Sequence, residues 1–163
     1  MLQKQRTCTY GLPKQTIGIN KKSNKKNELY NAWGSWLNTF SWQYYTTLTT
    51  NYPLTIYSAE KAIKRFVNAT EKEFGRTQIF WVAEKFDLTH SYHIHALIKF
   101  TNIPLQNTMH NMIRKYWYVV NKVNKNKGIH RTLVENYEKE KGGNFYFPKH
   151  LNKHNTNFGF SLD

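Results

Sequence analysis

The chain has a single cysteine, few acidic residues and no long apolar run. Cys8 is the only cysteine among 163 residues, which excludes a disulfide framework and a thiolate zinc site. No apolar run is long enough to cross a bilayer, and the N-terminal residues lack the apolar core of a signal peptide. These absences predict a cytoplasmic protein in a reducing compartment, or a nuclear one, without a membrane partner.

Acidic residues are scarce and unevenly placed. Ten Asp and Glu stand against 24 Lys and Arg, so the formal net charge is +14. No acid precedes Glu28, and none lies between Asp87 and Glu135. The basic residues of that second acid-free stretch are Lys99, Arg114, Lys115, Lys122, Lys125, Lys127 and Arg131. Such an excess favours a polyanionic partner, nucleic acid before membrane, over a merely solvated basic surface.

The hydrophobic content of 39% is that of a globular chain, and the length suits one domain. Residues 1–26 are polar and basic and are expected to form a flexible or loosely docked arm, which leaves residues 27–163 as the domain. Periodicity and breaker residues predict, in order, helix 27–38, strand 41–50, a helix capped by Ser58 and ended by Gly75, strands 78–86 and 91–100, a helix opened by Pro104, strand 128–136 and helix 144–153. This order predicts an α+β fold, a ferredoxin-like or RRM-like central antiparallel sheet of about five strands with flanking helices.

The most informative stretch is residues 91–100, in which every second residue is apolar, from Ile94 to Phe100. Successive side chains of a strand point to opposite faces, so His93 and His95 emerge together on the face away from those apolar residues. Two imidazoles on one rigid element supply two ligands of a divalent metal site. The alternative is a pair of surface histidines on an ordinary strand.

A third ligand follows from the pairing of the two central strands. If the hairpin turns between Leu88 and Thr89, Glu84 lies directly opposite His93, with β-carbons about 5 Å apart. Glu84 is also the only carboxylate between residues 78 and 86. Two imidazoles and a carboxylate suit Mn²⁺ or Mg²⁺, and zinc or another transition metal also accepts them. The alternative is a surface Glu in water.

Tyr146 is the candidate nucleophile for a phosphate held by such a metal. If Asn144 caps the helix, Pro148 falls in the first turn, where its missing N–H costs little. Lys149 then shares a face with Tyr146, where its charge favours the phenolate and offsets charge building on a phosphoryl group. The alternative is a half-buried core Tyr beside a solvated Lys.

These motifs, in this order, resemble the replication-initiator (Rep) branch of the HUH endonucleases, the enzymes of rolling-circle replication in small plasmids, phages and single-stranded DNA viruses. The first motif of that family is similar to Thr46–Thr50, the second to His93–His95 with Glu84, and the third to Tyr146–Lys149. The likeness covers about residues 41–153. Pro148 inside the nucleophile helix departs from the family pattern.

The resemblance implies a metal-dependent endonuclease that nicks and rejoins single-stranded DNA at a replication origin through a 5′-phosphotyrosine. Glu84, His93 and His95 would hold Mn²⁺ or Mg²⁺, Tyr146 would attack, and Lys149 would assist. Thr47, Thr49 and the basic residues of 99–131 would contact the DNA. The implied partners are single-stranded DNA or an origin hairpin, with host replication proteins beside it in the cytoplasm or nucleus of a host cell.

Two alternatives remain open. One is a single-tyrosine transposase of the same superfamily, which is also small and carries H-x-H before a helical Tyr. Nicking a hairpin origin without excising a flanked element would separate the initiator from it. The other is a non-catalytic nucleic-acid-binding module, because ferredoxin-like sheets often bind RNA.

Overall fold

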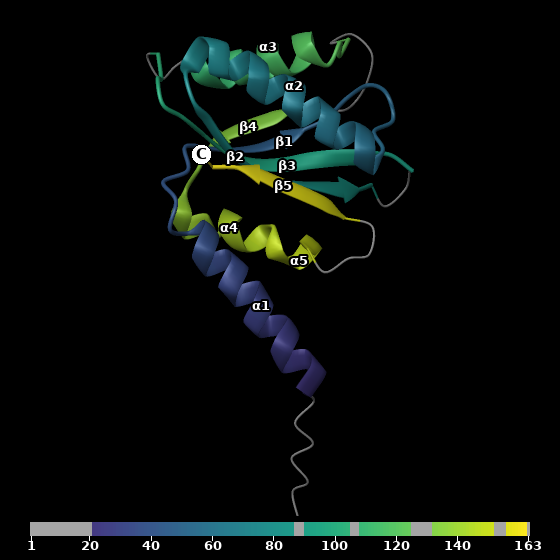
Figure 1. Ribbon diagram of the computed structural model, residues 1–163, viewed down its shortest axis with the longest axis vertical. Coiled ribbons are helices and arrows are strands. Elements are labelled where there is room, and N and C mark those ends of the chain that lie inside the picture. The colour runs from purple at the N-terminus through teal and green to yellow at the C-terminus, as the bar shows by residue number, and fades with distance from the viewer. Residues whose placement is uncertain (1–20, 87–89, 105–107, 125–131, 152–155, 163) are drawn as a thin grey trace, which may run out of the picture.

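A computed structural model describes residues 21–86, 90–104, 108–124, 132–151 and 156–162, with the side chains of 21–27, 149 and 150 excepted. Its strands are β1 (Tyr44–Leu48), β2 (Thr77–Lys85), β3 (Tyr92–Phe100), β4 (Leu133–Asn136) and β5 (Asn157–Ser161). Its helices are α1 (Lys21–Leu37), α2 (Ile56–Phe74), α3 (Met109–Val120), the short 3₁₀ helix η2 (Lys139–Lys141), α4 (Gly143–Tyr146) and α5 (Pro148–Leu151). The strands form one antiparallel sheet in the order β4-β1-β3-β2-β5, with helices on both faces (Figure 1). The predicted α+β class and antiparallel sheet are confirmed.

One face of the sheet is covered by α2 and α3 (Figure 1). The apolar stripe of α2 is buried against strand residues that include Ile94, Ala96 and Ile98. Gly75 ends α2 with a positive φ of 67°, a conformation that favours glycine. The prediction that Ser58 is the N-cap of this helix is wrong, because the N-cap of α2 is Thr55. Ser58 is instead the third helical residue of a capping box, in which its N–H donates to Thr55 Oγ1 and its hydroxyl oxygen accepts from the Thr55 N–H.

The opposite face is covered by α1, α4 and α5 (Figure 1). Phe80, Val82, Leu97 and Phe147 form its buried centre. The sheet is therefore buried on both sides at its middle, and the continuous apolar run of β2 reflects this. Helix α1 begins at Lys21, so it crosses the boundary expected at residue 26, while residues 1–20 of the expected arm lie outside the described residues.

The C-terminal third differs most from the expectation. The predicted helix 144–153 is two short helices interrupted at Phe147, because Pro148 has no N–H to continue the helical hydrogen bonds. Helix α4 begins after Gly142, which has φ 66°, so Asn144 is not its N-cap. Asn144 is instead buried and donates its Nδ2–H to the Gly34 carbonyl of α1 at 2.8 Å. Strand β5, for which the sequence predicted no element, pairs with β2.

Helix α1 and helix α4 approach closely at Gly34. A Cβ there would overlap the Phe145 ring, so glycine fits without shifting that side chain. Helix α3 begins at Met109 rather than near Pro104, and β4 begins at Leu133, whereas residues 128–131 of the predicted strand lie outside the described residues. Of the helices in the described ranges, none is both long and apolar enough to span a membrane.

Candidate functional site

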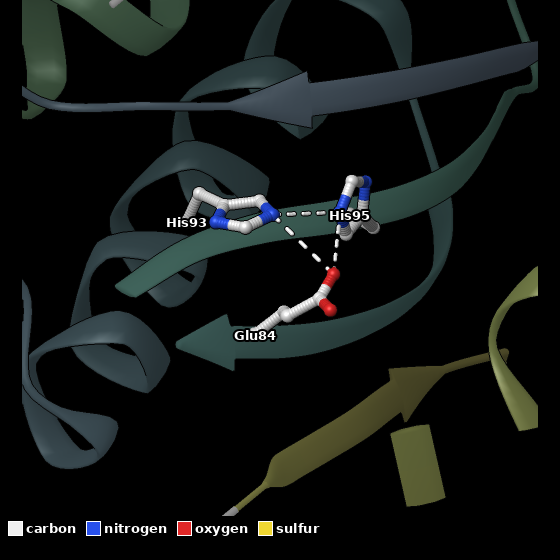
Figure 2. A group of neighbouring side chains, drawn as sticks. All are labelled: Glu84, His93 and His95. Atoms are coloured by element: carbon white, nitrogen blue, oxygen red, sulfur yellow. Dashed lines mark hydrogen bonds and ion pairs between the residues drawn. The ribbon is translucent and has the colours of Figure 1, made fainter. Parts of the chain in front are cut away.

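The two central strands bring three potential metal ligands together. Glu84 of β2 pairs directly with His93 of β3, which confirms the register predicted from the hairpin. His95 lies two residues on and therefore shares their face of the sheet, as Figure 2 shows. This is the face that α1, α4 and α5 cover, and the cluster lies toward the hairpin end of β2 and β3.

The side-chain atoms of the cluster converge on one point (Figure 2). His93 Nε2 and His95 Nε2 are 2.8 Å apart. Glu84 Oε2 lies 3.1 Å from His95 Nε2 and 3.4 Å from His93 Nε2. The side chains are 17%, 14% and 7% exposed for Glu84, His93 and His95, so the cluster is mostly withdrawn from water.

The spacing of these atoms fits a bound cation. Ligands about 2.1 Å from a shared ion stand roughly 3.0–3.4 Å from one another in octahedral or tetrahedral arrangements. The two distances to Glu84 Oε2, 3.1 and 3.4 Å, lie within that range, and the 2.8 Å between the two imidazole nitrogens is slightly shorter. The donor set of one carboxylate and two imidazoles is chemically suited to a divalent metal. Glu84, His93 and His95 can therefore hold a metal ion.

His95 is oriented by two hydroxyls of β1. Its Nδ1 lies 3.2 Å from Thr47 Oγ1 and 3.2 Å from Tyr45 Oη. A proton on Nδ1 that is donated to either hydroxyl oxygen leaves the Nε2 lone pair directed at Glu84. Outer-shell hydrogen bonds of this kind fix the ring and the tautomer of metal-binding histidines. Thr47, predicted as a DNA contact, thus contacts a residue of the candidate metal site.

Tyr146 reaches the same cluster from the end of α4. Its hydroxyl donates to Glu84 Oε2 at 3.2 Å and lies 3.5 Å from His95 Nε2. The ring packs edge-on against His95, with centroids 4.9 Å apart. Burial and then the negative charge of Glu84 raise the pKa of Tyr146 to about 12, so the side chain carries its proton at neutral pH. The structure brings the predicted nucleophile and the three predicted ligands together.

The basic residues predicted to contact DNA, and Lys149, lie in different parts of the molecule. Lys99 lies on the same face as His95, four residues along β3, whereas Arg114 and Lys115 lie on α3 across the sheet. The Arg114 guanidinium donates to the carbonyls of Thr132 and Val134 and so ties α3 to β4, while Lys122 follows α3 with an exposed side chain. The remaining predicted residues lie outside the described part of the chain: the side chain of Lys149, and residues Lys125, Lys127 and Arg131.

Thr49 was expected to line the DNA with Thr47, but its side chain is only 5% exposed. Its hydroxyl lies 3.5 Å from the Thr132 hydroxyl, and its carbonyl accepts from the Trp117 indole at 2.7 Å. Strand β1 ends at Leu48, so the alternation that would place Thr49 beside Thr47 does not continue. Thr49 therefore joins β1 to its neighbours rather than facing a ligand.

Sequence reasoning missed Tyr45 as a site residue. It lies two residues before Thr47 on β1, and the same alternation that placed Thr47 would have found it. Burial and next the proximity of Tyr146 raise its pKa above the ordinary value. The Tyr45 hydroxyl therefore acts as a neutral hydrogen-bonding group toward His95.

Comparisons with known proteins are sparse. No protein-family model and no curated protein matches the sequence. One similar solved structure is the hypothetical protein ORF119 from Sulfolobus islandicus rod-shaped virus 1, with 20% identity over 77% of this chain and 88% of that chain. Its TM-score of 0.42 is too low to assign a fold family or a function.

Proposed function

We propose that this chain is a metal-dependent endonuclease that nicks and rejoins single-stranded DNA through a 5′-phosphotyrosine intermediate on Tyr146. The observation that carries the proposal is the position of the Tyr146 hydroxyl, 3.2 Å from Glu84 Oε2 and 3.5 Å from His95 Nε2. A nucleophile that contacts the ligands of a cation can reach a phosphate bound at that cation. The net charge of +14 supports a polyanionic substrate.

The metal ion, for which we propose Mn²⁺ or Mg²⁺ on Glu84, His93 and His95, would supply positive charge to the phosphate oxygens during the reaction. Tyr146 Oη attacks the phosphorus in line, and the bond from phosphorus to the 3′ oxygen of the preceding nucleotide breaks. The phenol loses one proton and the departing 3′ oxygen gains one. The products are a phosphodiester between Tyr146 and the 5′ end, and a free 3′-hydroxyl.

The bond count explains how the same site can rejoin DNA. One phosphodiester is exchanged for another, so a 3′-hydroxyl that returns to the phosphorus reverses the step and releases Tyr146. The free 3′-hydroxyl can also prime a polymerase. Together with the motif resemblance to Rep endonucleases, this chemistry supports a replication origin as the natural substrate, with initiation of rolling-circle replication as the biological role.

The test is a covalent adduct of defined polarity. Purified protein is incubated with Mn²⁺ and a random-sequence pool of single-stranded oligonucleotides, labelled in parallel at the 3′ or the 5′ end. Because Tyr146 retains the 5′ phosphate, only the 3′-labelled pool is expected to give a labelled protein band that survives SDS. Tyr146→Phe should give none, while Tyr57→Phe, exposed on α2 across the sheet, should match the native protein.

Three outcomes would overturn the proposal. Label transfer from the 5′-labelled pool would reverse the polarity of the bond. An undiminished adduct in Tyr146→Phe would move the nucleophile elsewhere, with Tyr137 as the next residue to change. Retained DNA binding without any adduct, in the native protein and in Tyr57→Phe alike, would support the non-catalytic nucleic-acid-binding module instead.

A further inference from the structure

A pocket of about 520 Å³ adjoins the candidate site on the β4 side. Its volume lies in the range of roughly 300–1,000 Å³ that is typical of small-ligand sites. Aromatic rings form much of the wall, contributed by Tyr30 of α1, Tyr45 of β1, and Phe145 and Tyr146 of α4. The volume and the wall together suit a flat ring system.

The pocket and the metal cluster share two side chains. Tyr146 lines the pocket, and its hydroxyl contacts Glu84 and His95. Tyr45 also lines the pocket, and its hydroxyl contacts the other ring nitrogen of His95, Nδ1. If a phosphate of the substrate binds at the cluster, a base next to that phosphate can therefore reach this pocket.

The charge of the pocket is opposite to that of the chain as a whole. Two acidic residues, Glu135 and Glu138, and one cation, Lys141, line it, so acid exceeds base here in a protein with only ten acidic residues. Glu135 pairs directly with Tyr45 across the β1–β4 ladder, so its side chain is on the pocket face of the sheet. Glu138 forms an ion pair with Lys141 at 2.9 Å, whereas no ion pair of Glu135 occurs within the described ranges. A carboxylate here repels phosphate and accepts hydrogen bonds, which favours a base over the DNA backbone.

We propose that this pocket binds an unpaired guanine of the substrate next to the scissile phosphate, with Glu135 as the residue that selects it. Guanine presents two adjacent donors on its Watson–Crick edge, N1–H and N2–H, which match the two oxygens of one carboxylate. Cytosine and adenine offer one exocyclic amino group, and the single N–H of thymine lies between two acceptors. The aromatic walls supply stacking for the ring. The inference rests on the proposed function, because it names the substrate feature that the nicking site would read.

The experiment measures DNA binding without cleavage. The protein (residues 1–163) is incubated in EDTA with a random-sequence pool of single-stranded oligonucleotides, and the bound fraction is sequenced. The native protein should enrich guanine at one position of the bound motif. Glu135→Ala should reduce that preference about tenfold, since one good bidentate base contact is worth roughly that much. The matched control Glu140→Ala removes a neighbouring exposed carboxylate outside the pocket wall and should keep the preference.

A second variant tests the stacking wall. Tyr30→Ala should weaken binding of an oligonucleotide with the preferred guanine about fivefold or more, and should leave binding of the same oligonucleotide with an abasic site unchanged. The inference is overturned if no guanine is enriched, if Glu135→Ala retains the enrichment, or if Tyr30→Ala weakens both oligonucleotides equally. A guanine preference that depends on Glu135 would stand even if no covalent adduct forms, and an adduct without such a preference would leave nicking intact, so the two proposals fail separately.

Discussion

The two faces of the central sheet use the same strands for different purposes. On the face under α2 and α3, β1, β2, β3 and β4 contribute buried apolar side chains or small Thr side chains. On the face under α1, α4 and α5, the apolar centre gives way to Glu84, His93 and His95. Ile94 belongs to the first face and its two histidine neighbours to the second, so a single strand connects core and site.

The helices that cover the two faces differ as much as the strands do. Helix α2 has 19 residues and α3 has 12, whereas the site face is covered by one long helix, α1 with 17 residues, and by α4 and α5, which have four each. Helices shorter than about 12 residues are marginal by themselves. The position of Tyr146 therefore depends on tertiary contacts, namely the bond from Asn144 to Gly34 and the burial of Phe147. The long helices stabilise the sheet, and the short ones deliver a side chain to it.

The largest expected effect is the loss of metal binding when either histidine of β3 is replaced. His93→Ala or His95→Ala removes a ligand and should weaken Mn²⁺ binding by more than about 100-fold, because loss of even an outer-shell partner costs 10–100-fold. Adduct formation should be abolished in both variants, while binding of single-stranded DNA in EDTA remains. Isothermal titration with Mn²⁺ and the SDS-resistant adduct assay measure the two losses.

Ile94→Val is the matched control on the other face of the same strand. It deletes one buried methylene and should lower the free energy of unfolding by about 0.5–1.5 kcal/mol without changing Mn²⁺ affinity. If Ile94→Val weakened the metal as much as His95→Ala, the two faces would not be separable. Unaltered adduct formation by the native protein in excess EDTA would remove the metal from the mechanism.

The parts of the molecule that sequence reasoning predicted are those governed by regular periods. The period of two in residues 91–100 placed the histidines, the hairpin register placed Glu84, and the helix predicted to end at Gly75 is α2. These predictions required only neighbouring strands or a single helix. The structure also places Tyr146 beside the cluster, as the sequence predicted, although the predicted uninterrupted helix 144–153 was wrong.

The features that the sequence did not reveal depend on contacts distant in the chain. Strand β5 carries Phe158, Gly159 and Phe160 in a short polar segment, and only its pairing with β2 identifies it. Tyr45 belongs to the site because β1 lies beside β3. Glu135 faces the pocket because β4 pairs with β1, a neighbour almost 90 residues away in sequence. No local period encodes such juxtapositions.

The next expected effect compares two neighbouring threonines of β1. Thr47→Val removes the hydroxyl beside His95 Nδ1, keeps the shape of the side chain and suits a strand. It should weaken Mn²⁺ binding about tenfold, the lower end for an outer-shell partner, since Tyr45 Oη remains 3.2 Å from the same nitrogen. Mn²⁺ titration of the double variant with Tyr45→Phe should show a further loss.

Thr46→Val is the control for Thr47→Val. Thr46 faces the opposite side of the sheet, toward α2 and α3, and its hydroxyl donates to the Ala96 carbonyl at 3.3 Å. Its loss should cost about 1 kcal/mol of folding stability and leave the Mn²⁺ affinity unchanged. Equal Mn²⁺ affinities for Thr47→Val and the native protein would show that Tyr45 alone orients His95.

The smallest expected effect lies farthest from the site, at the start of α2. Thr55→Ala removes the side-chain oxygen that accepts from the Ser58 N–H at 3.1 Å and should lower the free energy of unfolding by about 1 kcal/mol in urea titrations. Because α2 packs on the face opposite the cluster, Mn²⁺ affinity and adduct formation should match those of the native protein. A parallel loss of metal affinity would mean that the two faces are coupled through the strands, so that stability of the α2 layer sets the geometry of Glu84, His93 and His95.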